Sequence, residues 1–205
     1  MRSRSTTAGL AAATALVAAC ATTTFHSTFK APEATPLNFK GKKVAALIVS
    51  KEEGVRYGAE DALAREITAM GAVGLPAYNL IPKELVRDRD KAKEFLEKAG
   101  VAGVVAMRVV GKEQEVSSSA YWGSPYYGSF WGAGYYSWGW SGVYDPGYLH
   151  ADTVVSVETL VYSLAQDKLV WAGVSRTTNP DQVKAFVKEL AAGAAAELKK
   201  QGLIK

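Results

Sequence analysis

An unbroken apolar run of strand length, KVAALIVS at residues 43–50, constrains the fold more than any other feature of the sequence. Consecutive side chains of a strand point to opposite faces of a sheet, so a run of this kind must be covered on both faces. The run therefore predicts a strand that is buried on both sides.

The segments after this strand alternate between helical and extended patterns. The first is a helix that ends at Gly71, and its apolar face is formed by Ala59, Leu63, Ile67 and Met70. The later patterns predict a strand, a helix, a strand, a hairpin of two strands and a final helix, at residues 73–78, 87–99, 101–116, 152–177 and 179–202. This order predicts an α+β fold, an α/β sandwich with a single mixed sheet of four or five strands packed against about three helices.

Two residues near the end of the chain have specific predicted roles. Asn179 is expected to cap the final helix, with Pro180 at its first position and Gln182 closing a capping box. Trp171, on the second strand of the hairpin, is expected to be a core residue.

Residues 41–205 are long enough for one domain with a substantial core.

The amino terminus has the pattern of a secretory signal. Two arginines precede an apolar run of about ten residues, whereas a bilayer-spanning helix needs about twenty. Leu16 to Cys20 resemble the bacterial lipobox, an aliphatic residue three positions before a cysteine with small residues between them. The resemblance implies that residues 1–19 are a signal peptide and that Cys20 carries a thioether diacylglycerol and a third chain such as palmitate. Residue 21 is Ala and not Asp, and by resemblance to lipoprotein sorting in bacteria with two membranes this implies the outer membrane.

Residues 20–40 are expected to be a tether, because they lack periodicity and contain Pro32 and Pro36. A flexible chain of this length would hold the domain about 25 Å from the lipid. Three phenylalanines in this segment indicate that part of it docks on the domain.

An uncharged segment rich in aromatic residues and glycine separates the third and fourth predicted strands. Residues 121–148 hold eleven of the fifteen Tyr and Trp residues of the chain, and the long loop is expected at residues 117–149. Four interpretations are open: an insertion without a ligand, a membrane-interface segment, a surface that binds a polymer or protein, and self-association. The candidate contact residues are Tyr121, Trp122, Tyr126, Tyr127, Phe130, Trp131, Tyr135, Tyr136, Trp138, Trp140, Tyr144 and Tyr148.

The sequence offers little catalytic chemistry. His26 and His150 are the only histidines, so a side-chain metal site, a cofactor and a catalytic triad are not expected. The formal net charge is only +4, and the Lys and Arg residues do not cluster into a basic stripe. Both observations argue against nucleic acid as a partner. The charged residues of the first helix, with Glu52 and Arg56 or Asp61 and Arg65 four apart, are expected to form a solvated face of surface ion pairs; Glu60 and Glu66 belong to the same face.

Several features of the sequence together have a known arrangement: the lipobox and the segments KVAALIVS, EDALAREITAMGA, PAYNLIP, AGVAGVVAMRVVGKEQEV and DKLVWAGVS. Over residues 41–201 this arrangement resembles the amino-terminal domain of the Tol-Pal translocation protein, which several uncharacterised lipoprotein families share. We therefore expect a non-enzymatic outer-membrane lipoprotein that faces the periplasm and acts as a binding or scaffolding module, with an envelope protein or polysaccharide as partner. The alternative is an accessory subunit of an envelope transport or assembly complex.

Overall fold

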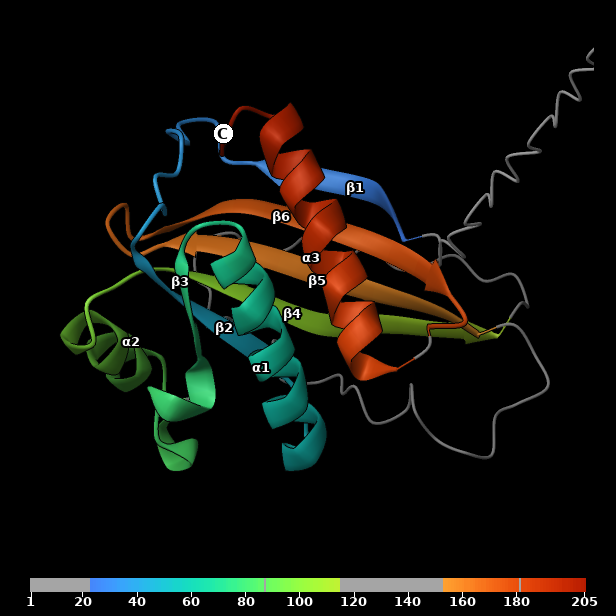
Figure 1. The fold of residues 1–205 in the computed structure, drawn as a ribbon, viewed down its shortest axis with the longest axis horizontal. Coiled ribbons are helices and arrows are strands. Elements are labelled where there is room, and N and C mark those ends of the chain that lie inside the picture. Colours follow the sequence, from blue (N-terminus) through green and yellow to red (C-terminus); the bar gives the residue numbers. More distant parts are fainter. Residues whose placement is uncertain (1–22, 87, 115–152, 181) are drawn as a thin grey trace, which may run out of the picture.

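The structure is a computed structural model that describes residues 23–86, 88–114, 153–180 and 182–205. In this part of the chain, three α-helices and two short 3-10 helices pack around one six-stranded sheet (Figure 1). In chain order the elements are β1 (Thr24–Lys30), β2 (Lys43–Val49), α1 (Glu53–Ala69), β3 (Val73–Pro76), η1 (Ala77–Asn79), η2 (Lys83–Leu85), α2 (Arg89–Lys98), β4 (Val101–Gln114), β5 (Thr153–Ser163), β6 (Lys168–Thr178) and α3 (Val183–Lys200). The predicted α+β fold with one mixed sheet is confirmed.

The strands lie in the order β1-β6-β5-β4-β2-β3. β2 runs parallel to both of its neighbours, because the chain returns to the sheet through the crossovers that contain α1 and α2. The pairs β4–β5, β5–β6 and β1–β6 are antiparallel. The sheet is therefore parallel at one end and antiparallel at the other.

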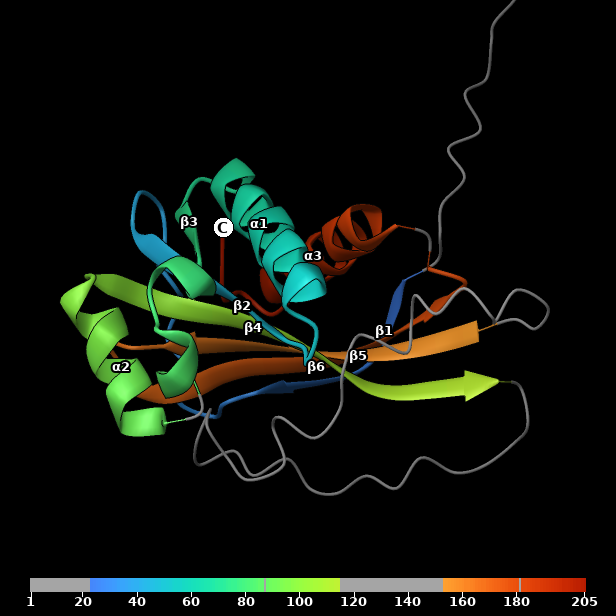
Figure 2. The ribbon, with the colours of Figure 1, turned by 90° about the horizontal axis from the view of Figure 1, so that it is seen from below.

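β2 is buried on both faces, as its apolar run predicts. Val44 and Ile48 belong to the cluster under α1 and α3, whereas Leu47 and Val49 belong to the cluster under α2 and the 3-10 helices. Figure 2 shows α1 and α3 side by side on one face of the sheet, with α2 at one end. The helices α1 and α3 thus form one layer over the centre of the sheet.

The tether predicted at residues 20–40 contains a strand, β1, so the sheet has one strand more than the expected maximum of five. A β-bulge between Phe25 and Ser27 places the two strand phenylalanines on opposite faces. The ring of Phe25 packs 5.7 Å from that of Trp171 under α3, and Phe29 joins the cluster on the other face. Both rings anchor β1 to the domain, and Trp171 is the buried core residue that was predicted.

Two local predictions are wrong. Met70, predicted on the inward face of α1, lies just beyond the helix and is 49% exposed. Asn179 does not cap α3, which begins at Val183 after Gln182. Asn179 has φ 48°, and its Oδ1 accepts a hydrogen bond from the backbone N–H of Thr153 at 2.8 Å. Its side chain therefore caps the start of β5 and not the start of α3.

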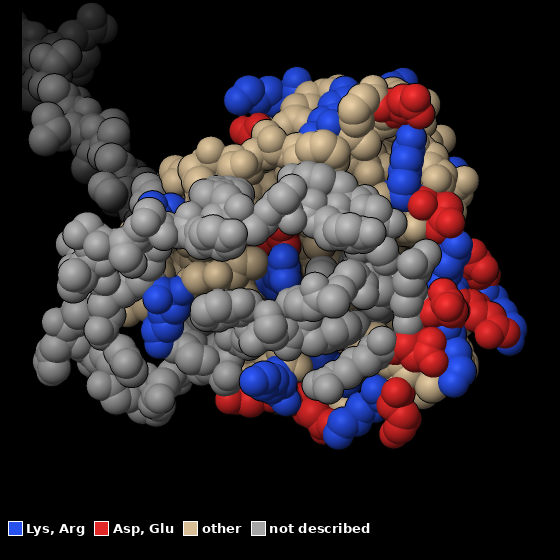
Figure 3. All heavy atoms as spheres, turned by 180° about the vertical axis from the view of Figure 1, so that it is seen from behind, with Lys and Arg blue, Asp and Glu red and all other residues tan. Residues whose placement is uncertain are grey.

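Charged side chains of both signs gather at the end of the molecule that carries α2 (Figure 3). Lys98 and Glu94 form an ion pair of 2.6 Å along this helix, and Lys93 pairs with Asp167 of the β5–β6 turn at 2.7 Å. Exposed pairs of this kind contribute little free energy. This end is a mixed, solvated surface.

Candidate ligand-binding groove

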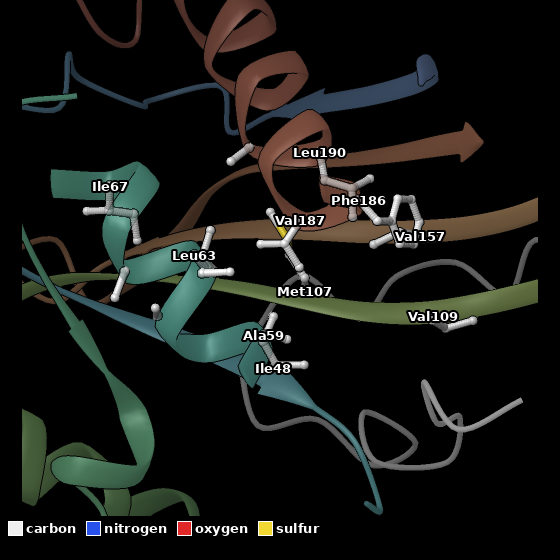
Figure 4. Packing of buried hydrophobic residues seen from close by; sticks show 14 of the residues in the cluster. Ile48, Ala59, Leu63, Ile67, Met107, Val109, Val157, Phe186, Val187 and Leu190 are labelled. Carbon is white, nitrogen blue, oxygen red and sulfur yellow. The ribbon is translucent and has the colours of Figure 1, made fainter. Parts of the chain in front are cut away.

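A groove with a volume of about 1050 Å³ lies between α1 and α3. Strands β2, β4 and β5 form its floor, through residues that include Val44, Met107 and Val161. Leu63 and Ile67 line it from α1, and Figure 4 shows Leu63 beside Met107 of β4. The groove therefore reaches from the surface down to the sheet.

Small residues in α3 leave this space open. At the amino-terminal half of α3, Phe186, Val187 and Leu190 are fully buried in the cluster shared with α1 (Figure 4). The next turns carry Ala191, Ala194 and Ala195, all of which line the groove. Alanine is too short to reach across the gap between two helices, so the helices pack closely at one end and leave a groove at the other.

The segment that connects β1 to β2 closes one end of the groove. Leu37 donates its backbone N–H to the carbonyl of Leu203 at 2.6 Å, which fixes the segment beside the end of α3. Phe39 lies over β4, where a Cβ on Gly103 would come within 2.4 Å of the ring. Residues 36–40 therefore belong to the site, although the sequence places them in a tether.

The lining of the groove is apolar with a basic rim. Its charged members are Lys40, Lys199 and Lys205, all of which are exposed. The described lining contains no Asp, Glu, His, Cys, Ser or Thr. Sites for small molecules are mostly lined by apolar side chains with a few polar groups, and the groove has this composition.

A buried carboxylate lies under the other side of α1. Glu60 is 0% exposed, and its carboxylate accepts hydrogen bonds from the backbone N–H of Ile48 at 3.2 Å and of Tyr78 at 2.8 Å. β3 ends at Pro76, so beyond Ala46 the backbone of β2 is paired with β4 on one side but has no strand on the side of β3, where Glu60 accepts a hydrogen bond instead. Burial raises the pKa of Glu60 to about 7, while the N–H donors of Tyr78 and Ile48 and the charge of Arg56 lower it.

The prediction of a solvated charged face on α1 is wrong for Glu60 and for Arg56, which is 8% exposed. Arg56 stacks on Tyr57, with its guanidinium carbon 5.0 Å from the ring centroid. Its spacing from Glu60 and from the apolar positions Leu63 and Ile67 is four, then three, then four residues. That helical spacing was the available signal that both charged residues share the buried face.

A smaller crevice of about 450 Å³ adjoins this buried pair at the end of β2. Arg56, Lys51 and an ion pair between Lys83 and Glu53 line it. Its lining is charged with both signs and exposed at the ion pair. Because Glu60 is bonded to backbone on both oxygens, we assign that carboxylate a structural role.

Most of the residues that the sequence marks as functional lie outside the described residues. These include Cys20, His150 and the twelve aromatic contact residues between Tyr121 and Tyr148. His26 lies in β1, where partial burial and then the charge of Arg176 lower its pKa. Within the described residues, no three His, Cys, Asp and Glu side chains are placed to hold a metal ion. Nor does any described helix have the length and apolar character needed to cross a membrane.

No protein-family model matches the sequence, and comparison with curated proteins finds no match. Among solved structures, the chain is similar to the PelC dodecamer from Paraburkholderia phytofirmans, with 12% identity over 86% of this chain and 97% of that chain and a TM-score of 0.48. A PelC variant with one substitution gives 14% identity, coverage of 82% and 95%, and a TM-score of 0.47.

A third similar structure is lipoprotein GNA1162 from Neisseria meningitidis, with 12% identity over 78% of this chain and 99% of that chain and a TM-score of 0.40. One of these proteins is thus described as a bacterial lipoprotein, and none is described by the Tol-Pal domain that the sequence resembles. At these identities and TM-scores the likeness assigns no role to any residue of this chain.

Proposed function

We propose that this chain is a non-enzymatic lipoprotein of the bacterial cell envelope that works as a binding module. The observation that carries the proposal is the groove between α1 and α3, a large apolar concavity whose described lining contains no carboxylate, imidazole, thiol or hydroxyl group for catalysis. Such a surface can hold a ligand, and it has few groups that could move protons or attack a substrate.

The lipid anchor at Cys20 is part of this proposal. β1 begins at Thr24, so four residue steps separate the anchor from the sheet and span at most about 14 Å. The domain would then sit closer to the lipid than the 25 Å expected for a flexible tether. We propose the outer membrane and the periplasmic side as its location, on the strength of the lipobox pattern and Ala21.

The aromatic segment is proposed as a second contact surface. It joins the ends of β4 and β5, and Gln114 and Thr153 are directly paired there. Both ends of the segment are thus fixed at one place on the sheet, as in a hairpin with an insertion at its tip. An insertion of this kind can bind a partner without being part of the core.

An alternative is an accessory subunit of an envelope transport or assembly complex. The observation in its favour is β1, a seven-residue strand at the sheet edge that pairs with β6 on one side. A strand in this position can accept a strand of a partner protein.

Metabolic labelling with radioactive palmitate tests the anchor. The wild-type protein should be labelled and found with membranes, and a Cys20→Ser variant should be neither. Crosslinking in cells, followed by purification of the tagged protein, separates the two functions: a partner recovered in fixed stoichiometry favours the accessory subunit. An unlabelled wild-type protein would contradict the proposed envelope function.

A further inference from the structure

The groove has the shape and the charge of a site for one kind of ligand. We propose that it binds a single-chain anionic amphiphile, with the acyl chain against the sheet between α1 and α3 and the anionic head group at Lys40 and Lys199. This inference rests on the proposed function as a binding module and names the chemical class of the ligand.

The volume and the lining favour an acyl chain. Pockets for small molecules have volumes of about 300–1,000 Å³ and mostly apolar linings, and the groove, at about 1050 Å³, is just larger than that range. Its floor and walls are built from aliphatic side chains, such as Val44, Leu63 and Leu198, together with the alanines of α3. A flexible chain of methylene groups can follow such a surface and is stabilised there by the removal of its apolar area from water.

The rim decides the charge of the head group. The groove opens near the carboxyl ends of α1 and α3, and each helix end carries a partial charge of about −0.5, which disfavours an anion. Lys40 and Lys199 supply two full positive charges, so the balance at the mouth is positive. Lys205 also lines the groove and is exposed, and its side chain adds to this positive charge.

An exposed apolar residue marks the rim. Met70 lines the groove and is 49% exposed, one of the two large hydrophobic side chains that are exposed in the described part of the chain. A ligand chain lying in the groove would cover its thioether. The opposite orientation, with the head group at the sheet, is disfavoured because it would bury an unpaired charge among aliphatic side chains.

The full chain carrying Cys20→Ser, which removes any acyl chain of its own, is the protein for the test. Dansylundecanoic acid, a fluorescent fatty acid, should bind saturably at one molecule per chain. Laurate should displace it, and dodecanol and dodecylamine should compete severalfold less well, up to about tenfold, since two exposed ion pairs contribute a factor of this size.

Matched variants locate the site. Ala195→Phe fills the groove and should weaken laurate binding about tenfold or more, whereas Ala196→Phe, on the exposed face of α3, should not change it. Lys199→Glu should remove the preference for laurate over dodecanol, and Lys188→Glu, an exposed lysine of α3 outside the groove, should keep it. Met70→Glu, at an exposed position, should weaken the binding of laurate and strengthen the binding of dodecylamine. This variant replaces Ala195→Phe in the test if the phenylalanine variant fails to fold.

Several outcomes would overturn the inference. Equal binding by the Ala195→Phe and Ala196→Phe variants would place the probe elsewhere on the chain. Equal binding of laurate and dodecanol would remove the role of the lysines. A change of mass in light scattering with Ala195→Phe, without a change in probe binding, would make the groove an interface between copies. Palmitate labelling and crosslinking do not depend on the groove, so the envelope function could stand after each of these failures.

Discussion

Replacing Glu60 by glutamine should change how the stability of the protein depends on pH. The carboxylate is fully buried, and both oxygens accept backbone N–H groups, from Ile48 and from Tyr78. Glutamine has the same shape but offers one oxygen, so one of these N–H groups loses its acceptor. That loss lowers the free energy of unfolding by about 1–3 kcal/mol at low pH.

The pH dependence follows from the direction of the pKa shift. Burial raises the pKa of Glu60 from 4.5 to about 7. The folded state therefore holds a proton that the unfolded state has lost between these pH values, and the contribution of Glu60 to stability is fully present below about pH 4.5 and is lost as pH rises through about 7. The loss amounts to about 3 kcal/mol. The Glu60→Gln variant cannot titrate at this site, so the advantage of the wild type over the variant should fall by this amount and vanish or change sign by pH 8.

Urea unfolding followed by circular dichroism at a series of pH values from 4.5 to 8 measures the difference. Other titrating groups are common to both proteins and cancel in the comparison. Glu84→Gln, at an exposed position of η2, is the matched control and should leave the pH profile unchanged. A wild-type and Glu60→Gln difference that stays constant across this range would refute the reasoning, because Glu60 would then have the same charge in the folded and unfolded states.

Substitutions in three further parts of the structure test the packing by urea unfolding. Gly74→Ala should lower the free energy of unfolding by about 3 kcal/mol, because its Cβ would lie 2.0 Å from a carbonyl oxygen of α1, while Gly58→Ala, with no neighbour within 4 Å, should raise it by up to about 1 kcal/mol. Arg108→Met should lower the free energy of unfolding by about 3 kcal/mol, because it leaves the buried carboxylate of Glu158 without its 2.5 Å ion pair. Adding Glu158→Met should restore most of this stability, and equal stability of the single and double variants would contradict the explanation. Asn179→Ala should lower the free energy of unfolding by about 1–2 kcal/mol. Asn179→Gly should lower it less, because both variants lose the side-chain hydrogen bond to β5 but glycine adopts the φ of 48° without strain.

The sequence predicted the elements whose signals are local. The apolar run of β2 and the spacing of Leu63 and Ile67 in α1 report burial directly, and both residues are buried where the pattern places them. The turn of the late hairpin was also visible, and Asp167 there has φ 46°. Strands and helices of this kind need no knowledge of distant residues.

The features that were missed depend on residues far apart in the chain. β1 is stabilised by pairing with β6 at the other end of the sequence, and its Phe25 fits against Trp171 and above Gly193 of α3. Glu60 is buried because N–H groups of β2 and η1 reach its carboxylate, which the charge pattern of α1 alone does not reveal. The alanines of α3 show in the sequence that this helix has small side chains. The groove also requires that α1 lies opposite them, which the sequence does not show.

The place of β1 in the sheet has a consequence for the order in which the chain can assemble. A ribosome makes the protein from its amino end, so residues 24–30 emerge before the other strands of the described sheet. Their only partner strand in that sheet, β6, ends at Thr178. Until nearly the whole polypeptide has been synthesised, Phe25 and Phe29 have no completed surface to cover them. During that interval the newborn amino end would be the part of the molecule most exposed to chaperones or to premature aggregation.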